Sequence, residues 1–180
     1  MGQQRDGAWI QTYTGIQFWP MDARPEEIAL LDIAHALSML CRFNGHCRRF
    51  YSVAEHSVHV SRVVGAADAR WGLLHDAAEA YLSDIPKPVK RVLPAFHPWE
   101  ERLLAVIADR FGLASPEPPE TVKQADLALL ASEKVVLMGP APASWGWMPE
   151  PVPGLEIVGW SPEEAKRVFL ARFAELFPEG

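Results

Sequence analysis

The 180-residue sequence has only two cysteines, Cys41 and Cys47, and no long uninterrupted apolar run. Two cysteines are too few for a four-cysteine zinc site, and we interpret them as reduced thiols. A membrane-spanning helix needs about 20 consecutive, mainly apolar residues, and no stretch approaches that length. The first residues are not followed by the apolar core of a secretory signal. We therefore expect a cytoplasmic protein without a membrane segment.

Positive charge is also scarce, because 17 lysines and arginines face 23 aspartates and glutamates, for a formal net charge of -6. Nucleic-acid backbones select strongly basic surfaces, so this balance argues against binding to polymeric nucleic acid. It is compatible with a small phosphorylated ligand held by a metal and a few basic side chains. The composition, 49% apolar and 22% charged, is that of a globular protein whose length fits one domain.

Alternation and turn signals organise the N-terminal part of the chain. Residues 8–24 alternate between apolar and polar side chains around Gly15, which predicts a short extended segment or hairpin. Asp32 is expected to cap a helix that runs to about Phe43, where an Asn-Gly pair would end it. A basic and aromatic loop is expected over residues 46–51.

Capping boxes and apolar periodicity predict further helices. A Ser-Val-Ala-Glu box at residues 52–55 starts a helix that runs to about Val64, and a Ser-Pro-Glu-Glu box starts the last one. Residues 139–160, rich in proline and tryptophan, predict an irregular loop that serves as a lid, an edge hairpin or an oligomer contact. The remaining helices are expected at residues 68–82, 97–111, 121–138 and 162–177. The predicted fold class is all-α, with one domain over residues 1–180.

Residues 71–84 carry titratable groups among unusually small side chains. His75 and Asp76 are adjacent, and Glu79 follows on the same side of a helix, three residues after the aspartate. One glycine and three alanines surround them, which permits close packing against other helices around a polar site. The alternative interpretation is an ordinary amphipathic helix with its polar face in water.

Two more polar residues interrupt apolar helix faces. His56 lies on the valine stripe of its helix, whereas His59 lies on the side predicted to be wetter. Asp126 lies in an apolar stretch, where an unpaired buried carboxylate would be costly. The structural interpretations are a core histidine and a carboxylate at a helix edge near Lys123. The functional interpretation is a metal site shared with residues 75–76, whose nitrogen and oxygen donors suit Mn, Fe, Co, Ni or Zn.

The ordered pattern of His56, His75, Asp76 and Asp126 resembles that of the HD-domain superfamily of metal-dependent phosphohydrolases. The local sequences Val-Ala-Glu-His-Ser, His-Asp-Ala-Ala-Glu and Asp-Ile-Pro-Lys-Pro-Val-Lys are similar to those of its compact 5′-deoxynucleotidases and phage deoxyadenosine-triphosphate hydrolases. The match covers roughly residues 30–137. It implies a single HD-domain helical bundle in which these four residues hold one divalent transition-metal ion, Mn, Co, Ni, Zn or Fe.

The resemblance also implies a reaction. Glu79 and Asp84 match carboxylates that activate water or protonate the leaving group during hydrolysis of a deoxynucleotide phosphate. Both phosphate release from deoxynucleoside monophosphates and triphosphate release from a deoxynucleoside triphosphate remain open. The alternatives are a metal- and nucleotide-binding sensor without turnover, and a redox di-iron oxygenase. The oxygenase would need extra histidines after the His-Asp pair, and none occurs between His75 and His97.

Four substrate contacts are implied in the same way. Arg42 and Phe43 resemble an Arg-Trp pair that holds phosphate and sugar, although phenylalanine replaces tryptophan and the spacing differs by one residue. Lys87 and Lys90 are expected to meet phosphates, and the basic loop at residues 46–51 is either a further contact or a solvated loop. Relatives of this size form dimers or larger assemblies, so a homo-oligomer is expected.

Overall fold

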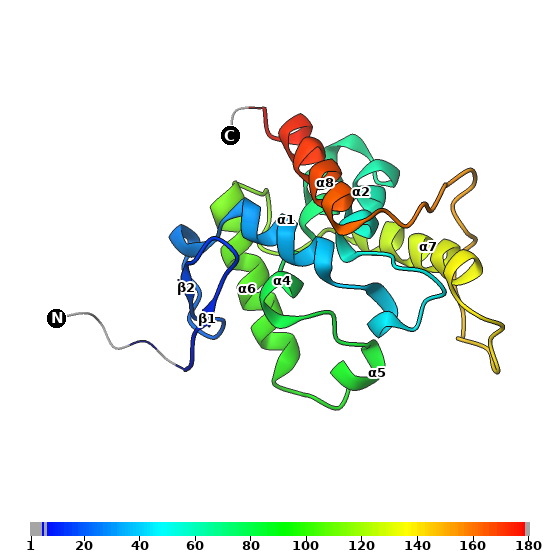
Figure 1. Ribbon diagram of the computed structural model, residues 1–180, viewed down its shortest axis with the longest axis horizontal. Coiled ribbons are helices and arrows are strands. Elements are labelled where there is room, and N and C mark those ends of the chain that lie inside the picture. The colour runs from blue at the N-terminus through cyan, green and yellow to red at the C-terminus, as the bar shows by residue number, and fades with distance from the viewer. Residues whose placement is uncertain (1–4, 6, 179–180) are drawn as a thin grey trace.

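A computed structural model describes residue 5 and residues 7–178, and helices dominate this part of the chain (Figure 1). Helices account for 54% and strands for 3%, which confirms the mostly helical fold class. Among the residues described, every helix is too short or too polar to cross a lipid bilayer. The α-helices are α1 (Leu30–Met39), α2 (Val53–Val63), α3 (Ala69–Leu74), α4 (Glu79–Leu82), α5 (Lys87–Lys90), α6 (Phe96–Phe111), α7 (Glu120–Leu137) and α8 (Pro162–Leu176). Short 3-10 turns are η1 (Pro25–Glu27), η2 (Arg42–Gly45) and η3 (Ala66–Asp68).

The N-terminal segment forms the short hairpin that its alternation predicts. Strand β1 (Ile10–Gln11) pairs antiparallel with strand β2 (Gln17–Phe18). Phe18 is fully buried and stacks on Tyr81 of α4, with ring centroids 4.2 Å apart. This aromatic contact fixes the hairpin to the helical domain.

Helix α2 lies at the centre of the fold. Residues 53–61 are all buried, and the helix packs against α1, α3, α7 and α8 (Figure 1). Its valine, alanine and serine side chains are small enough for several helices to approach it closely. Helix α8 contributes Ala165, Phe169 and Phe173 to the largest hydrophobic cluster, so the core extends beyond residues 30–137.

The contact between α2 and α3 depends on Gly72. A Cβ atom added there would lie 2.8 Å from Ser61 Cα and 2.9 Å from Val64 Cγ1. Carbon atoms pack best at about 3.5–4.0 Å, so a larger residue would push the two helices apart. The close approach matters for the site, because α3 leads directly into His75.

We expect Gly72→Ala to lower the free energy of unfolding by about 1–3 kcal/mol, because the backbone of α2 or α3 must move. Gly65→Ala is the matched control, since Gly65 has a φ of -55° and nothing within 4 Å of an added Cβ. That control should be neutral or slightly stabilising. Urea unfolding monitored by circular dichroism measures both, and equal midpoints for the two variants would contradict the prediction.

The expectation that Asp32 caps α1 is wrong. The helix begins at Leu30, and Ala29 is the residue that precedes it. Asp32 lies inside the first turn, where its buried carboxylate accepts hydrogen bonds from Thr14 N at 2.7 Å and Thr14 Oγ1 at 2.9 Å. Its side chain therefore holds the hairpin loop against α1 and is not free to cap the helix.

The expected extension of this helix to Phe43 is also wrong, because α1 ends at Met39. Phe43 and Asn44 have left-handed backbone conformations, with φ of 56° and 52°, which an α-helix cannot contain. Cys41 and Cys47 flank this turn with free thiols whose sulfur atoms lie 3.4 Å apart.

The single helix expected over residues 68–82 is divided in two, with α3 ending at Leu74 and α4 beginning at Glu79. Between the two helices, backbone hydrogen bonds join residues three apart rather than four, from Ala77 N to Leu74 O and from Glu79 N to Asp76 O. Beyond the proline break, residues 87–90 form the additional short helix α5.

Residues 139–160 contain no helix or strand, which confirms an irregular segment. The prediction that the His59 side of α2 is the wetter one is wrong, since His59 is 5% exposed and Glu55, on the same side of the helix, is 0% exposed. Its carboxylate accepts hydrogen bonds from the backbone N–H groups of Val158, Gly159 and Trp160, at 3.1, 2.9 and 2.6 Å. The end of the irregular segment is thereby fastened to the central helix.

Candidate metal centre

Two imidazole side chains meet at the contact between α2 and α3. His56 comes from the fully buried first half of α2, and His75 follows the last residue of α3. Their Nε2 atoms lie 3.3 Å apart. The Nδ1 atom of His75 donates to Gly72 O at 2.9 Å, which leaves its Nε2 as an electron-pair donor toward His56.

Two carboxylates complete the cluster. Asp76 Oδ2 lies 3.3 Å from His75 Nε2 and 3.7 Å from His56 Nε2. Asp126, on α7, places Oδ1 3.2 Å from His56 Nε2. Ligands bound to one ion at about 2.1 Å lie roughly 3.0–3.4 Å from each other, so these separations suit a shared metal. The ligand atoms of His56, His75 and Asp126 all lie within 4.8 Å of one another and could hold an ion.

Glu133 holds the first of these histidines in place. It is 0% exposed on α7, and its Oε1 lies 2.6 Å from His56 Nδ1. A carboxylate that accepts a hydrogen bond from Nδ1–H leaves Nε2 free to bind a metal and fixes the orientation of the ring. The sequence analysis missed this residue. A signal was present, because Glu133 follows Asp126 by two helical turns and so lies on the same face.

Arg42 lies between the three carboxylates of this cluster. Its Nε donates to Glu133 Oε2 at 3.1 Å, and its other nitrogens lie 3.6 Å from Asp76 and 3.9 Å from Asp126. Burial lowers the pKa of Arg42, but these three carboxylates outweigh burial and raise it above its usual value. Arg42, the predicted substrate contact, is therefore at the candidate site, where it balances the negative charge of these carboxylates.

The carboxylates of this cluster keep His56 protonated when no metal is bound. Burial and the Arg42 charge lower the pKa of His56, but Glu133 and Asp126 outweigh them and raise it to about 9. Burial raises the pKa of Asp76, but His75, His56 and Arg42 hold it well below its usual range. A metal must therefore displace a proton from an imidazole that is surrounded by ionised groups.

We expect metal affinity to fall about tenfold for each pH unit below pH 9, because each bound ion releases the His56 proton. Titration calorimetry with Mn²⁺ measures this directly, in buffers that differ in ionisation enthalpy. One proton released per ion at pH 7 is the expected result. Affinity independent of pH between 6 and 8 would contradict it.

Glu79 and Asp84, the two predicted catalytic residues, lie near enough to Asp76 for its charge to act on both. Glu79 is 6% exposed, its Oε2 has no hydrogen-bond partner among the described residues, and its Oε1 lies 3.6 Å from Lys90 Nζ. Burial raises the pKa of Glu79 well above its usual value, and the charges of Asp76 and Asp84 raise it further. Burial also raises the pKa of Asp84, against the lowering effect of Arg42. Enzymes commonly raise the pKa of a carboxyl group by burial when that group takes part in proton transfer.

The other predicted substrate contacts differ in how close the structure brings them. Lys90 reaches the site, bridging Glu79 and Glu100, with 2.6 Å between Lys90 Nζ and Glu100 Oε1. Phe43 follows Arg42, whose guanidinium lies 5.7 Å from the centre of its ring. Lys87 is exposed on α5 and has no partner among the described side chains.

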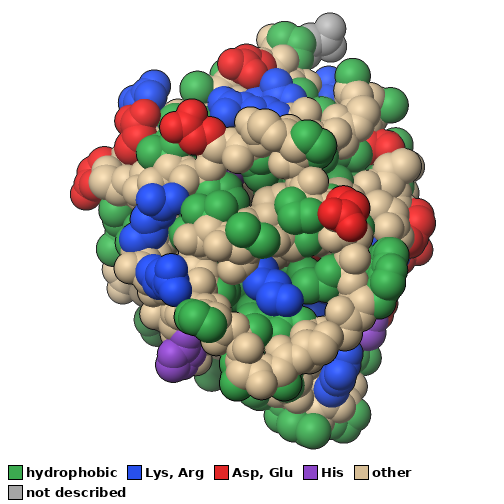
Figure 2. Space-filling model, turned by 90° about the vertical axis from the view of Figure 1, so that its right-hand side faces the viewer, with side chains coloured by type: hydrophobic (Ala, Val, Ile, Leu, Met, Phe, Trp, Pro, Cys, Tyr) green, Lys and Arg blue, Asp and Glu red, His purple; other side chains and the backbone are tan. Residues whose placement is uncertain are grey.

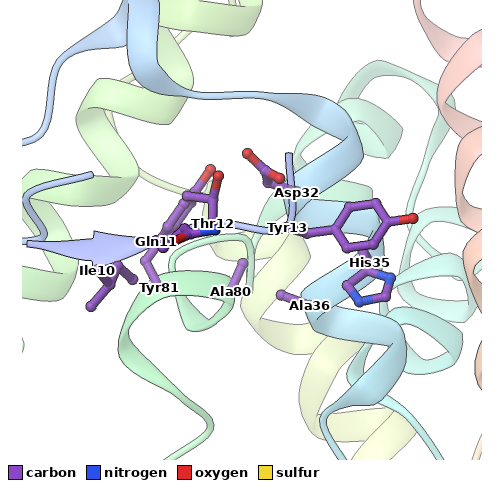
Figure 3. Close-up of a pocket in the computed structure, with 9 residues that line it drawn as sticks. All are labelled: Ile10, Gln11, Thr12, Tyr13, Asp32, His35, Ala36, Ala80 and Tyr81. Atoms are coloured by element: carbon purple, nitrogen blue, oxygen red, sulfur yellow. The ribbon is translucent and has the colours of Figure 1, made fainter. Parts of the chain in front are cut away.

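Two hollows lie along α1 and α4. One, of about 440 Å³, is lined in part by Glu79. The other, of about 300 Å³, lies between the hairpin, α1 and α4 and includes no residue of the candidate metal centre (Figure 3). There the Tyr13 ring stacks on His35, with centroids 3.7 Å apart, consistent with a structural role for this histidine.

Two curated proteins are similar to this chain over nearly its whole length. YfdR of Escherichia coli K12, an uncharacterized protein, is 40% identical over 172 residues, which cover 94% of this chain and 96% of YfdR. The chain belongs to the YfdR family. An uncharacterized protein of Rhodobacter capsulatus is 35% identical over 184 residues, covering 92% of this chain and 93% of that protein. No protein-family model matches the chain.

The similarity within the YfdR family extends well beyond residues 30–137, which carry the ordered histidine and aspartate pattern. It therefore includes parts of the chain outside the metal centre, in keeping with the core contribution of α8.

Proposed function

We propose that this protein is a metal-dependent phosphohydrolase of the HD-domain type that acts on deoxynucleotides. The proposed cofactor is one divalent transition-metal ion, Mn, Co, Ni, Zn or Fe. The proposed ligands are His56, His75, Asp76 and Asp126. We further propose that the protein works as a homo-oligomer.

The convergence of these four residues is the observation that supports the proposal most. They come from α2, the turn after α3, and α7, yet the donor atoms of the other three lie 3.2–3.7 Å from His56 Nε2. Two imidazoles and two carboxylates form a mixed donor set, which suits a transition metal better than calcium or magnesium. The Glu133 contact to His56 Nδ1 is of the kind that orients metal-binding histidines.

The surrounding residues of the chain support hydrolysis of a phosphate group. A metal bound here would supply an activated water and stabilise the charge that develops on phosphorus. Glu79, with its free Oε2, would accept a proton from that water, and Asp84 would protonate the leaving oxygen. Arg42 and Lys90 are positive groups already at the site, and each would turn from a carboxylate toward a substrate phosphate.

A phosphate-release screen tests the proposal. Metal-stripped protein is resupplied with Mn, Co, Ni, Zn or Mg and incubated with each deoxynucleoside mono- and triphosphate, beside a Glu79→Gln variant. Orthophosphate from monophosphates identifies a 5′-deoxynucleotidase, and triphosphate identifies a triphosphohydrolase. Binding of metal and nucleotide without turnover would contradict the enzyme proposal and favour a nucleotide sensor instead.

A further inference from the structure

An aromatic pair lies beside the metal centre, and one of its members comes from the irregular segment. Trp145 is 41% exposed, and its ring centroid lies 6.3 Å from that of Phe43, with the planes tilted by 53°. Lys134 of α7 places its ammonium 5.0 Å from the centre of the Trp145 ring. Figure 2 shows the face of the molecule that carries this segment, where hydrophobic side chains gather between lysines and arginines.

Phe43 is held beside Trp145 by an unfavourable backbone conformation. Phe43 has a φ of 56°, a conformation that L-residues other than glycine seldom adopt, and Asn44 continues it. The ring also packs against the small cluster of Tyr51, Leu137 and Ile157. Such unfavourable conformations concentrate at binding and catalytic sites, where the surrounding structure imposes them.

Arg42 connects the aromatic pair to the metal centre. Its guanidinium lies 5.7 Å from the Phe43 ring centroid and 3.6 Å from the Asp76 carboxylate. One side chain therefore separates the aromatic rings from the proposed metal ligands. A phosphate at the metal would leave the rest of a small phosphorylated molecule next to the rings.

We propose that Trp145 and Phe43 form a slot that binds the base of the substrate nucleotide between their rings. This inference rests on the proposed function, because the phosphate of the same molecule would occupy the metal centre. Flat rings stack at about 3.5 Å, so a base between two rings needs roughly 7 Å between their centres. The present 6.3 Å and the tilt mean that Trp145 must move outward slightly when a base enters.

The segment that carries Trp145 permits such a movement. Residues 139–151 have no helix or strand, and the hydrogen bond described among them, from Gly146 N to Ser144 Oγ, is local. Phe43, by contrast, is fixed by its neighbours. Stacking tolerates every base because each has an aromatic face, so the slot accepts all four bases and binds the larger purines most tightly.

The test compares Trp145→Ala with Trp147→Ala. Trp147 lies in the same segment, is 81% exposed and has no ring partner among the described residues. Trp145→Phe is the conservative variant. Dissociation constants for dAMP are measured by calorimetry with Mn²⁺ in a Glu79→Gln background, which prevents turnover. Phosphate release is measured, with Glu79 intact, from dAMP and from 2-deoxyribose 5-phosphate, which lacks a base.

We expect Trp145→Ala to weaken dAMP binding about 5- to 100-fold, with most of the affinity kept by Trp145→Phe and all of it by Trp147→Ala. Release from 2-deoxyribose 5-phosphate should be the same in all four proteins. Unchanged dAMP binding in Trp145→Ala, or no binding of dAMP by the parent protein, would overturn the slot. If dAMP binds with the expected dependence on Trp145 but neither these two monophosphates nor any deoxynucleoside triphosphate is cleaved, the slot stands and the phosphohydrolase fails.

Discussion

Asp76→Asn is expected to remove both metal binding and phosphate release while leaving the helices intact. The change deletes a negative charge and an anionic ligand at an oxygen that lies 3.3 Å from His75 Nε2 and 3.6 Å from Arg42. Metal-assisted hydrolysis gains several kcal/mol from a correctly held ion, so we expect activity to fall at least about 1,000-fold. Phosphate release at saturating Mn²⁺ and metal content after dialysis are the two measurements.

Asp109→Asn provides the matched control for this prediction. Asp109 is an exposed carboxylate on α6, so its replacement removes the same charge from the protein without touching the cluster. The control should keep full metal content. If Asp76→Asn retained its metal and its activity, Asp76 would not be a metal ligand.

Glu133→Gln should weaken metal binding about 10- to 100-fold although Glu133 is not itself a ligand. The amide has the same shape but no charge, so it holds the His56 Nδ1 proton more weakly and leaves Arg42 without its closest anion. Since Glu133 raises the pKa of His56, that pKa should also fall in the variant. Removing one partner of a buried ion pair costs about 3–5 kcal/mol of stability. We therefore expect the free energy of unfolding to fall by no more than this amount.

Weaker metal binding and a lower His56 pKa would show that Glu133 positions His56, because a loss of stability alone would change neither. Metal affinity is measured by titration, and the His56 pKa by NMR of the imidazole, both below the unfolding temperature. Glu120→Gln, at the exposed start of the same helix, is the control and should change neither. A Glu133→Gln protein that was less stable yet bound metal as the parent does would mean that Glu133 supports only the fold.

Candidate site residues could be predicted where residue type and spacing within a short stretch of sequence indicate a function. His75 and Asp76 stand together, and His56 and Asp126 each break an apolar helical pattern, so residue type and spacing marked all four as candidates. The resemblance to the HD-domain superfamily implied that they form one site. The approximate positions of α2, α6, α7 and α8 followed from capping boxes and periodicity in the same way.

The parts that sequence reasoning missed depend on contacts between distant segments. Glu133 bonds to a residue 77 positions away, and Glu55 bonds to backbone groups 103–105 positions away. No local pattern distinguishes such buried carboxylates from the glutamates that cover most helix surfaces. The division between α3 and α4, and the place of Asp32 inside α1, likewise reflect packing partners that override local preference.

The attachment of Glu55 to residues 158–160 has a consequence for how proteins of this kind can diverge. Glu55 and His56 are neighbours on one helix, so the anchor of the irregular segment and a proposed metal ligand share one rigid support. Insertions or deletions between residues 140 and 150 would change the position of the Trp145 ring. Val152 and Trp160 would stay attached to Ser132 and Glu55 through their backbone N–H groups. If the proposed function holds, changes in this loop would alter which molecule is bound while the proposed metal ligands stay in place.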